Sequence, residues 1–153
     1  MVSKFRRLIP KATDVLIYDS LGIQYLRRAI PDGVSFDRLN FREEIPITIS
    51  LRFFIQFLCE VVRSKFDVRQ SYIVAFINQY QPKVVISFSD RNPLLGVYAK
   101  NHPNVLVLVL QNGLRYPEKF DLLTKMPVYY SLGNASVEIV KKLNISCQRV
   151  VSA

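Results

Sequence analysis

Short runs of branched apolar residues alternate along the chain with longer segments of helical periodicity. The strand pattern recurs at residues 13–18, 34–39, 84–88, 105–110, 128–132 and 148–152. Between these runs the spacing of apolar residues predicts helices over residues 20–30, 51–65, 69–80 and 135–143, and a further helix that starts at Asn92-Pro93. This alternation is typical of a three-layer, Rossmann-like α/β domain, with a mostly parallel sheet and helices on both faces.

The predicted helices differ in how their apolar residues are distributed. In residues 51–65, with Ser50 as a candidate N-cap, apolar residues cover much of the circumference, so we expect this helix to be well buried. Residues 69–80 have the most regular amphipathic pattern, and Pro82 prevents the helix from continuing. Ser20 is the candidate N-cap of the first helix. The apolar positions of the 69–80 helix are Tyr72, Ile73, Phe76, Ile77 and Tyr80.

The length of 153 residues fits one domain, 1–153, that can bury a sizeable core without a metal or a disulfide. The sequence stops directly after the predicted strand at 148–152, whereas a doubly wound domain normally lays a further helix over such a strand. We therefore expect this sequence to be the first half of a longer protein, with a carboxyl-terminal domain absent from it. An edge strand that needs no cover is the alternative.

Polar residues follow the predicted strands at the edge where open parallel sheets bind ligands. Carboxylates, amides and an arginine at that edge can hydrogen-bond a polyhydroxylated ligand and provide one general base. Each residue also has a structural alternative: an aspartate can cap the next helix, Gln-Asn-Gly can be a turn, and the arginine can be a solvated loop charge. These residues are Asp19, Ser20, Asp90, Asn92, Gln111, Asn112, Gly113 and Arg115, followed by Gly133 and Asn134.

Several kinds of site are disfavoured by the residues present. No glycine-rich phosphate loop occurs, so a dinucleotide bound in the Rossmann manner is not expected. The two cysteines, Cys59 and Cys147, are far apart, and His102 is the single histidine, which argues against a zinc or histidine metal site. No Asp-x-Asp pair is present. We therefore expect neither a metal nor a cofactor.

The chain is basic, with 21 Lys and Arg against 12 Asp and Glu, a formal net charge of +9. Basic residues cluster near the amino terminus, at Arg27-Arg28 and at Lys141-Lys142. This charge fits anionic lipid or a phosphate-bearing substrate better than nucleic acid, because no nucleic-acid-binding motif occurs. No secretory signal and no run long enough to span a bilayer is found. The expected location is the cytoplasm, with peripheral contact at the inner face of the membrane.

The segment from Lys83 to Asp90, then Asn92, and the segment from Val107 to Arg115 resemble the amino-terminal half of bacterial surface-carbohydrate biosynthesis proteins. These are GT-B glycosyltransferases, distantly similar to CDP-glycerol glycerophosphotransferases and capsule sugar transferases. Residues 130–134 and 150–153 also match. The resemblance implies two Rossmann-like domains, of which this chain is the acceptor-binding one. The partners it implies are a nucleotide-activated sugar or polyol phosphate donor, held by the other domain, and a glycan or lipid-linked acceptor.

The sequence departs from that family at two positions. Arg91 separates Asp90 from Asn92, and Asn112 stands where teichoic-acid relatives carry a histidine. Since an amide cannot take a proton, the general base would be Asp90 or Asp19, or a residue in the absent domain. Asp90 is the preferred candidate. The other edge residues are expected to bind substrate: Asn92, Gln111, Asn112, Gly113 and Arg115 would orient the acceptor, and Asp19 and Ser20 would line the neighbouring edge.

Two other functions remain open from the sequence. One is a non-enzymatic Rossmann-like ligand-binding module, such as a flavodoxin-like sensor. The other is a small hydrolase or mutase on the same sheet, although no Gly-x-Ser-x-Gly nucleophile turn is present and Leu21 stands where a phosphatase-like Asp-x-Asp needs its second aspartate.

Overall fold

The fold was analysed in a computed structural model of the 153-residue chain. The structure describes residues 5–19, 22–41, 44–63, 67–88, 93–110, 128–131, 134, 137–138 and 149–152.

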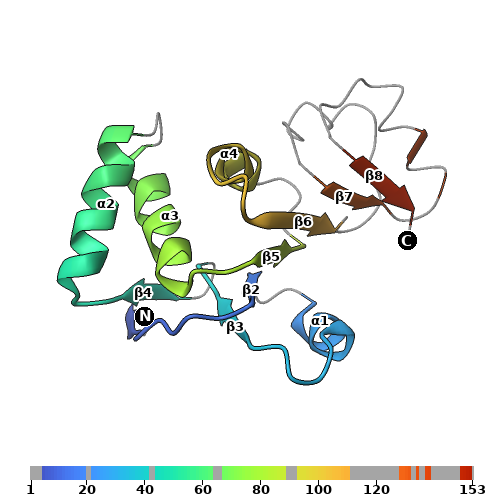
Figure 1. Ribbon diagram of the computed structural model, residues 1–153, viewed down its shortest axis with the longest axis horizontal. Coiled ribbons are helices and arrows are strands. Elements are labelled where there is room, and N and C mark those ends of the chain that lie inside the picture. Colours follow the sequence, from blue (N-terminus) through green and yellow to red (C-terminus); the bar gives the residue numbers. More distant parts are fainter. Residues whose placement is uncertain are drawn as a thin grey trace.

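Six parallel strands form the main sheet, in the order β3-β2-β5-β6-β7-β8 (Figure 1). Every neighbouring pair in this sheet is parallel, so the predicted α/β class with a parallel, Rossmann-like sheet is confirmed. All six predicted strand segments are present, and the first four are one or two residues shorter than predicted. Their bounds are Val15–Tyr18 (β2), Phe36–Leu39 (β3), Val84–Ser87 (β5), Leu106–Leu110 (β6), Val128–Ser131 (β7) and Arg149–Ser152 (β8).

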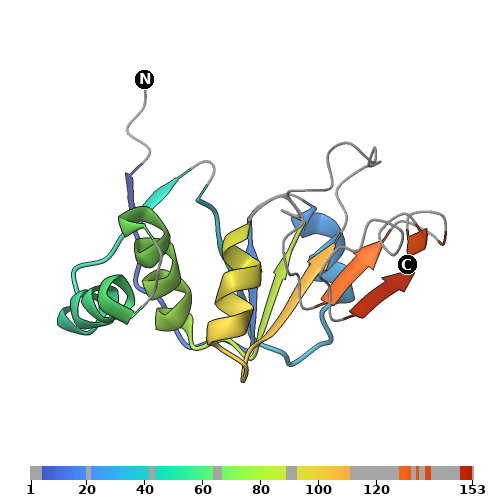
Figure 2. The same ribbon diagram turned by 90° about the horizontal axis from the view of Figure 1, so that it is seen from above.

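The helices lie on both faces of this sheet, as predicted. Figures 1 and 2 show α1 (Ile23–Ala29) on one side of the strands and α4 (Pro93–Asn101) on the other. The helix α3 (Val68–Tyr80) lies on the same side as α4, and α2 (Leu51–Arg63) packs against α3 at the end of the molecule. The predicted 135–143 helix falls largely outside the described residues.

The core is built on the α3–α4 face of the sheet. Val85 and Val109 are fully buried there, in one cluster with Leu95 of α4 and Phe76 of α3. The opposite face of β5 and β6 is only half-buried, and Leu106 is exposed. Burial of β5 and β6 is therefore complete on one face only.

A second, two-stranded parallel sheet was not predicted from the sequence. It pairs β1 (Phe5–Arg7) with β4 (Ile45–Ile47), and the Leu8 amide continues the ladder to the Ile47 carbonyl at 2.9 Å. Arg6 forms an exposed ion pair with Glu44 at 3.0 Å. This small sheet ties the amino-terminal segment to the chain that leads into α2.

The helix ends agree with the sequence except at α1. Ser50 caps α2 as predicted, accepting a hydrogen bond from the Phe53 amide at 3.4 Å, and α4 starts at Pro93. The N-cap of α1 is Gly22, in the left-handed conformation and without a side-chain cap. The prediction of Ser20 as this N-cap is therefore wrong, and Asp19 does not cap α1 either.

The burial predicted for residues 51–65 is also wrong. Among the described side chains of α2, residues 51–62, only Phe53 and Glu60 are buried, and several large apolar residues point outward. The neighbouring helix α3 is instead buried almost all round, including Val74 and Ala75 outside its predicted apolar face. Within the described residues, no helix combines the length and apolar character that crossing a bilayer requires.

Candidate functional site

The order of the strands defines one special place in the main sheet. From β2 the chain crosses to β3 on one side, and it later enters β5 on the other side. The strand order thus reverses between β2 and β5, and ligands of open α/β sheets bind beyond the carboxyl ends of the strands at such a point. Figure 2 shows the arrowheads of β5, β6 and β7 directed to the same edge. We call this edge the carboxyl edge.

The four polar segments singled out from the sequence follow β2, β5, β6 and β7, which are consecutive neighbours in the sheet. The prediction that these strands lie side by side and are parallel is confirmed. Among the candidate residues themselves, the structure describes Asp19, and also Asn134, which is exposed. The other candidates lie outside the described residues: Ser20, Asp90, Asn92, Gln111, Asn112, Gly113, Arg115 and Gly133.

Asp19 lies directly beyond β2, at the point where the strand order reverses. Asp19 is 3% exposed, and its backbone amide donates a hydrogen bond of 2.9 Å to the Leu39 carbonyl at the end of β3. Its φ of 90° is positive, which is uncommon for a residue other than glycine and costs on the order of 1–3 kcal/mol. Non-glycine residues held in this way cluster at functional sites. A buried carboxyl group on a strained turn therefore marks this end of β2.

The turn after β2 also touches the end of β5. Gly22 has a φ of 69°, and a Cβ atom added to it would lie 2.4 Å from a ring carbon of Phe88, which directly follows β5. No side chain fits between the two segments at this point. From the sequence, Gly22 is expected at this edge as the single glycine of the first strand-helix turn, but its contact with Phe88 was not predicted.

Two buried serines end strands at the same edge. Ser87 is the last residue of β5 and Ser131 the last of β7, and both are fully buried. In the register of the sheet Ser87 lies beside Val109, and Ser131 beside Ser152 of β8. The sequence analysis treated both as ordinary strand residues. Because both serines are buried, polar side chains at this edge occur within the sheet as well as in the segments that follow it.

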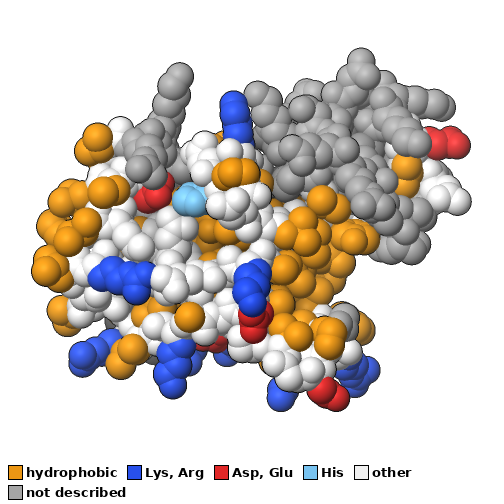
Figure 3. All heavy atoms as spheres, viewed as in Figure 1, with side chains coloured by type: hydrophobic (Ala, Val, Ile, Leu, Met, Phe, Trp, Pro, Cys, Tyr) orange, Lys and Arg blue, Asp and Glu red, His pale blue; other side chains and the backbone are white. Residues whose placement is uncertain are grey.

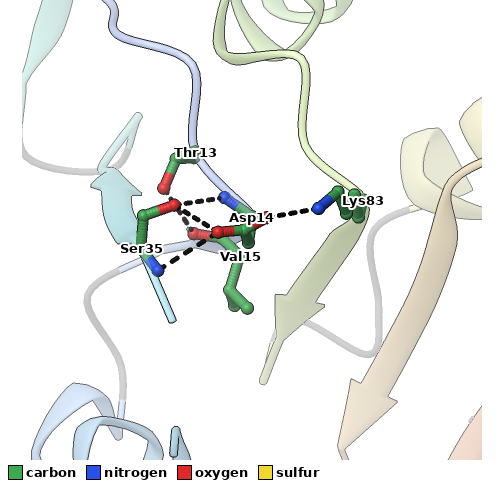
Figure 4. Close-up of polar contacts among 5 residues, drawn as sticks. All are labelled: Thr13, Asp14, Val15, Ser35 and Lys83. Carbon is green, nitrogen blue, oxygen red and sulfur yellow. Dashed lines mark hydrogen bonds and ion pairs between the residues drawn. The ribbon is translucent and has the colours of Figure 1, made fainter. Parts of the chain in front are cut away.

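The opposite edge, which we call the amino edge, is held together by an ionic contact (Figure 4). Asp14 precedes β2, and its carboxylate accepts hydrogen bonds from the Lys83 Nζ at 2.7 Å and from the Ser35 Oγ at 2.5 Å. The Lys83 and Ser35 side chains hold the pKa of this carboxyl at about 2. Since Ser35 precedes β3 and Lys83 precedes β5, one side chain links the starts of three strands.

The single histidine belongs to a different polar group, between α2, α3 and α4. Glu60 accepts a hydrogen bond from Asn78 at 3.2 Å and lies 4.0 Å from the His102 Nε2. The Tyr98 hydroxyl donates to the Asn78 side-chain oxygen at 3.1 Å, and burial raises the Tyr98 pKa, with Glu60 adding to the effect. Because α4 runs back from the carboxyl edge, His102 at its end lies near the amino edge. Across the described ranges, no three His, Cys, Asp or Glu residues are grouped to hold a metal ion.

Comparison with known proteins identifies no relative. No protein-family model, curated protein or solved structure matches the chain. The features that define the candidate site are therefore those of the chain itself: the reversal of strand order between β2 and β5, the buried Asp19 and the close contact of Gly22 with Phe88.

Proposed function

We propose that this chain is the acceptor-binding, amino-terminal half of a GT-B type glycosyltransferase that acts in bacterial surface polysaccharide synthesis. The acceptor, a glycan or a lipid-linked glycan, binds at the carboxyl edge. A nucleotide-activated sugar or polyol phosphate is held by a second domain that faces this edge. The proposal includes a cytoplasmic location at the inner face of the membrane.

The observation that supports this proposal most is the parallel, consecutive arrangement of β2, β5, β6 and β7. It directs four polar segments of the sequence to one edge, including the segments that resemble the glycosyltransferases. Strand ends are also where parallel α/β folds place their ligands. The buried Asp19 and its positive φ add a second feature of a functional turn at the same edge.

In the proposed reaction, a base removes the proton from the acceptor hydroxyl as that oxygen attacks the donor, and the nucleotide part of the donor leaves with the electron pair of the broken bond. We assign the base to Asp90. Asp19, at 3% exposure, lies beneath the surface, where its carboxylate offers little area to an incoming hydroxyl. Asn112 has no basic site, and together with Asn92, Gln111 and Arg115 it would hold acceptor hydroxyls or an anionic group.

A second candidate, a Rossmann-like ligand-binding module without catalysis, is favoured by the strand order. Counting only the strands of the main sheet, the order is 2-1-3-4-5-6, which begins like that of flavodoxin. Flavodoxin-like folds bind their ligand where the strand order reverses, which corresponds here to the place between β2 and β5. The two functions differ in the fate of the ligand, which a module releases unchanged.

The test uses the protein that carries both domains. A panel of nucleotide sugars and CDP-glycerol is screened by thermal shift, because a ligand that binds only the folded state raises the melting temperature. Each donor that binds is then assayed for transfer to a glycan acceptor. We expect Asp90→Asn to abolish transfer while it leaves donor binding and the melting temperature unchanged.

Asp32→Asn is the matched control, since Asp32 is an exposed turn residue away from the carboxyl edge. It should transfer at the wild-type rate. Wild-type turnover by Asp90→Asn would remove Asp90 from the mechanism. Ligand binding without transfer to any acceptor would favour the binding module.

A further inference from the structure

The outward face of α2 is apolar. Six large aliphatic or aromatic side chains there are between 45% and 87% exposed. On α2 they are spaced at i, i+3, i+4, i+7 and i+11, which places them in one stripe along the helix. Figure 3 shows this stripe as hydrophobic side chains along the left edge of the molecule. The residues are Ile49, just before the helix, and Leu51, Phe54, Ile55, Leu58 and Val62.

The inward face of α2 is fixed by partners on its neighbours. Glu60 is buried and hydrogen-bonded to Asn78 of α3, and Gln56 bonds to Gln79 of the same helix. Phe53 packs against Phe76, with ring centroids 4.7 Å apart. If the helix turned to bury the apolar stripe, Glu60 and Gln56 would lose these hydrogen bonds. Losing a hydrogen bond lowers the free energy of unfolding most where the polar group is buried. The apolar stripe therefore stays outside because the polar residues have partners inside.

The sequence around the stripe is basic. Residues 48–70 contain four basic residues and two acidic ones, Glu60 and Asp67. Both acidic side chains are engaged: Glu60 is buried, and Asp67 caps α3 by accepting from the Gln70 amide at 2.7 Å. Arg52 is exposed and borders the stripe. The face therefore combines apolar side chains with positive charge, on a chain with a net charge of +9.

We propose that the outward face of α2 docks on the surface of an anionic lipid bilayer. Leu51, Phe54, Ile55, Leu58 and Val62 enter the boundary between headgroups and acyl chains, and Arg52 meets lipid phosphates. An amphipathic helix with large apolar residues on one face and basic residues beside it binds membranes in this way, with strength from both terms. A second copy of the chain is disfavoured as the occupant because it also carries a net charge of +9. This docking surface rests on the membrane location that the proposed function includes, and it does not depend on sugar transfer.

The structure offers a direct probe, since Cys59 is an exposed free cysteine on α2. An environment-sensitive fluorophore is attached to Cys59 in a Cys147→Ser chain. The labelled chain is titrated with vesicles of phosphatidylcholine alone, or of phosphatidylcholine with about one third phosphatidylglycerol, and unlabelled wild-type chain is tested by vesicle co-sedimentation. We expect a blue shift and sedimentation with the anionic vesicles, and weakening of both in high salt.

The double variant Phe54→Ser/Leu58→Ser should lower the vesicle affinity about tenfold or more, because it removes two inserting side chains. Arg52→Glu should lower it on anionic vesicles alone. The matched control is Tyr25→Ser/Val97→Ser, which changes two exposed apolar residues on α1 and α4 and should bind as the wild type does. The melting temperature of each variant verifies that it folds, and Val62→Ser is the milder replacement if the double variant does not.

Three results would overturn the proposal. The first is that anionic vesicles do not bind the wild-type chain. The second is that the double variant, or Val62→Ser in its place, binds as tightly as the control. The third is a concentration-dependent dimer in sedimentation velocity that the double variant abolishes, which would make a second copy of the chain the occupant of the face. None of these readouts involves sugar transfer, so their failure would leave the glycosyltransferase proposal standing.

Discussion

The two edges of the main sheet are built on opposite principles. At the amino edge, Asp14 joins the starts of three strands through exposed contacts with Ser35 and Lys83, and its φ is not positive. At the carboxyl edge, Asp19 is buried with a φ of 90°, and Gly22 leaves no space for a side chain beside Phe88. Both edges use an aspartate next to the same strand, β2, one residue before it and one residue after it.

The residues of the amino edge connect strands and stabilise the fold, whereas those of the carboxyl edge form the surface of the candidate site. The exposed contacts of the amino edge are individually weak, because solvent competes for each of them. At the carboxyl edge, the strained φ of Asp19 persists because the surrounding structure holds it in place, and backbone strain of this kind is common at binding sites. Substitutions at the two edges should therefore differ both in size and in kind.

The largest effect is expected from Gly22→Ala. Alanine must adopt a φ of 69°, and its Cβ would lie 2.4 Å from the Phe88 ring. Left-handed backbone and overpacking together should cost about 2–4 kcal/mol in the free energy of unfolding. Gly33→Ala is the matched control, with a φ of 86° and no atom within 4 Å of the added Cβ, and should cost about 1–2 kcal/mol. Urea denaturation measures both.

Phe88→Ala tests whether the close contact causes the difference. In a Phe88→Ala background, Gly22→Ala should cost no more than Gly33→Ala, because only the backbone strain remains. An undiminished cost in that background would mean that the Gly22 position is sensitive for a reason other than Phe88.

The next effect concerns the strained turn at Asp19. Asp19→Ala should lower the free energy of unfolding by about 1–2 kcal/mol, because alanine tolerates a φ of 90° less well than aspartate does. Asp19→Gly should be more stable than Asp19→Ala by about 1 kcal/mol, since glycine has no Cβ to strain. If the alanine variant is the more stable of the two, the turn is not strained.

A smaller effect is expected at the amino edge from Ser35→Ala. The substitution removes the hydroxyl that donates to the Asp14 carboxylate and accepts from the Asp14 amide at 2.9 Å. Because these bonds are exposed, the loss should be about 0.5–1 kcal/mol. A loss as large as that of Gly22→Ala would contradict the contrast between the two edges.

The smallest effect is a change of stability with pH. The pKa of Asp14 falls from 3.8 to about 2 on folding, so its ionised form favours the folded state. This contribution is complete above pH 4 and is lost as the pH falls from 4 towards 2. Lys83→Met, which removes the cation whose own pKa Asp14 raises, should flatten this part of the stability profile. A profile unchanged by Lys83→Met would show that the ion pair has no role in stability.

Most strands of the main sheet were predictable because they are continuous apolar runs, such as Val107 to Leu110; β3, which contains Asp37 and Arg38, is an exception. The two short strands β1 and β4 were missed, since three residues carry no periodic pattern and their pairing joins positions 40 residues apart. The parallel arrangement of the strands follows from their alternation with helices, but the packing at Gly22 depends on where the Phe88 ring lies in space. That contact could not be read from the sequence.

The burial of the two helices α2 and α3 also could not be predicted from the sequence. The sequence shows which side of α2 is apolar but not which side meets the protein. Gln56 and Glu60 turn inward because Gln79 and Asn78 of α3 provide partners for them, and this pairing requires both helices to be placed. Hydrophobic pattern alone assigned the buried role to α2 and the amphipathic role to α3, the reverse of what the structure shows.

The most direct test of the proposed site is a titration of the ¹⁵N-labelled chain, followed by NMR, with sn-glycerol 3-phosphate and with glucose 1-phosphate as fragments of an acceptor. We predict that the amide signals of Asp19, Gly22 and Phe88 at the carboxyl edge shift with increasing ligand, while those of Asp14, Ser35 and Lys83 at the amino edge do not. Shifts confined to the amino edge, or no shift with either phosphate up to millimolar concentration, would contradict the placement of the acceptor site.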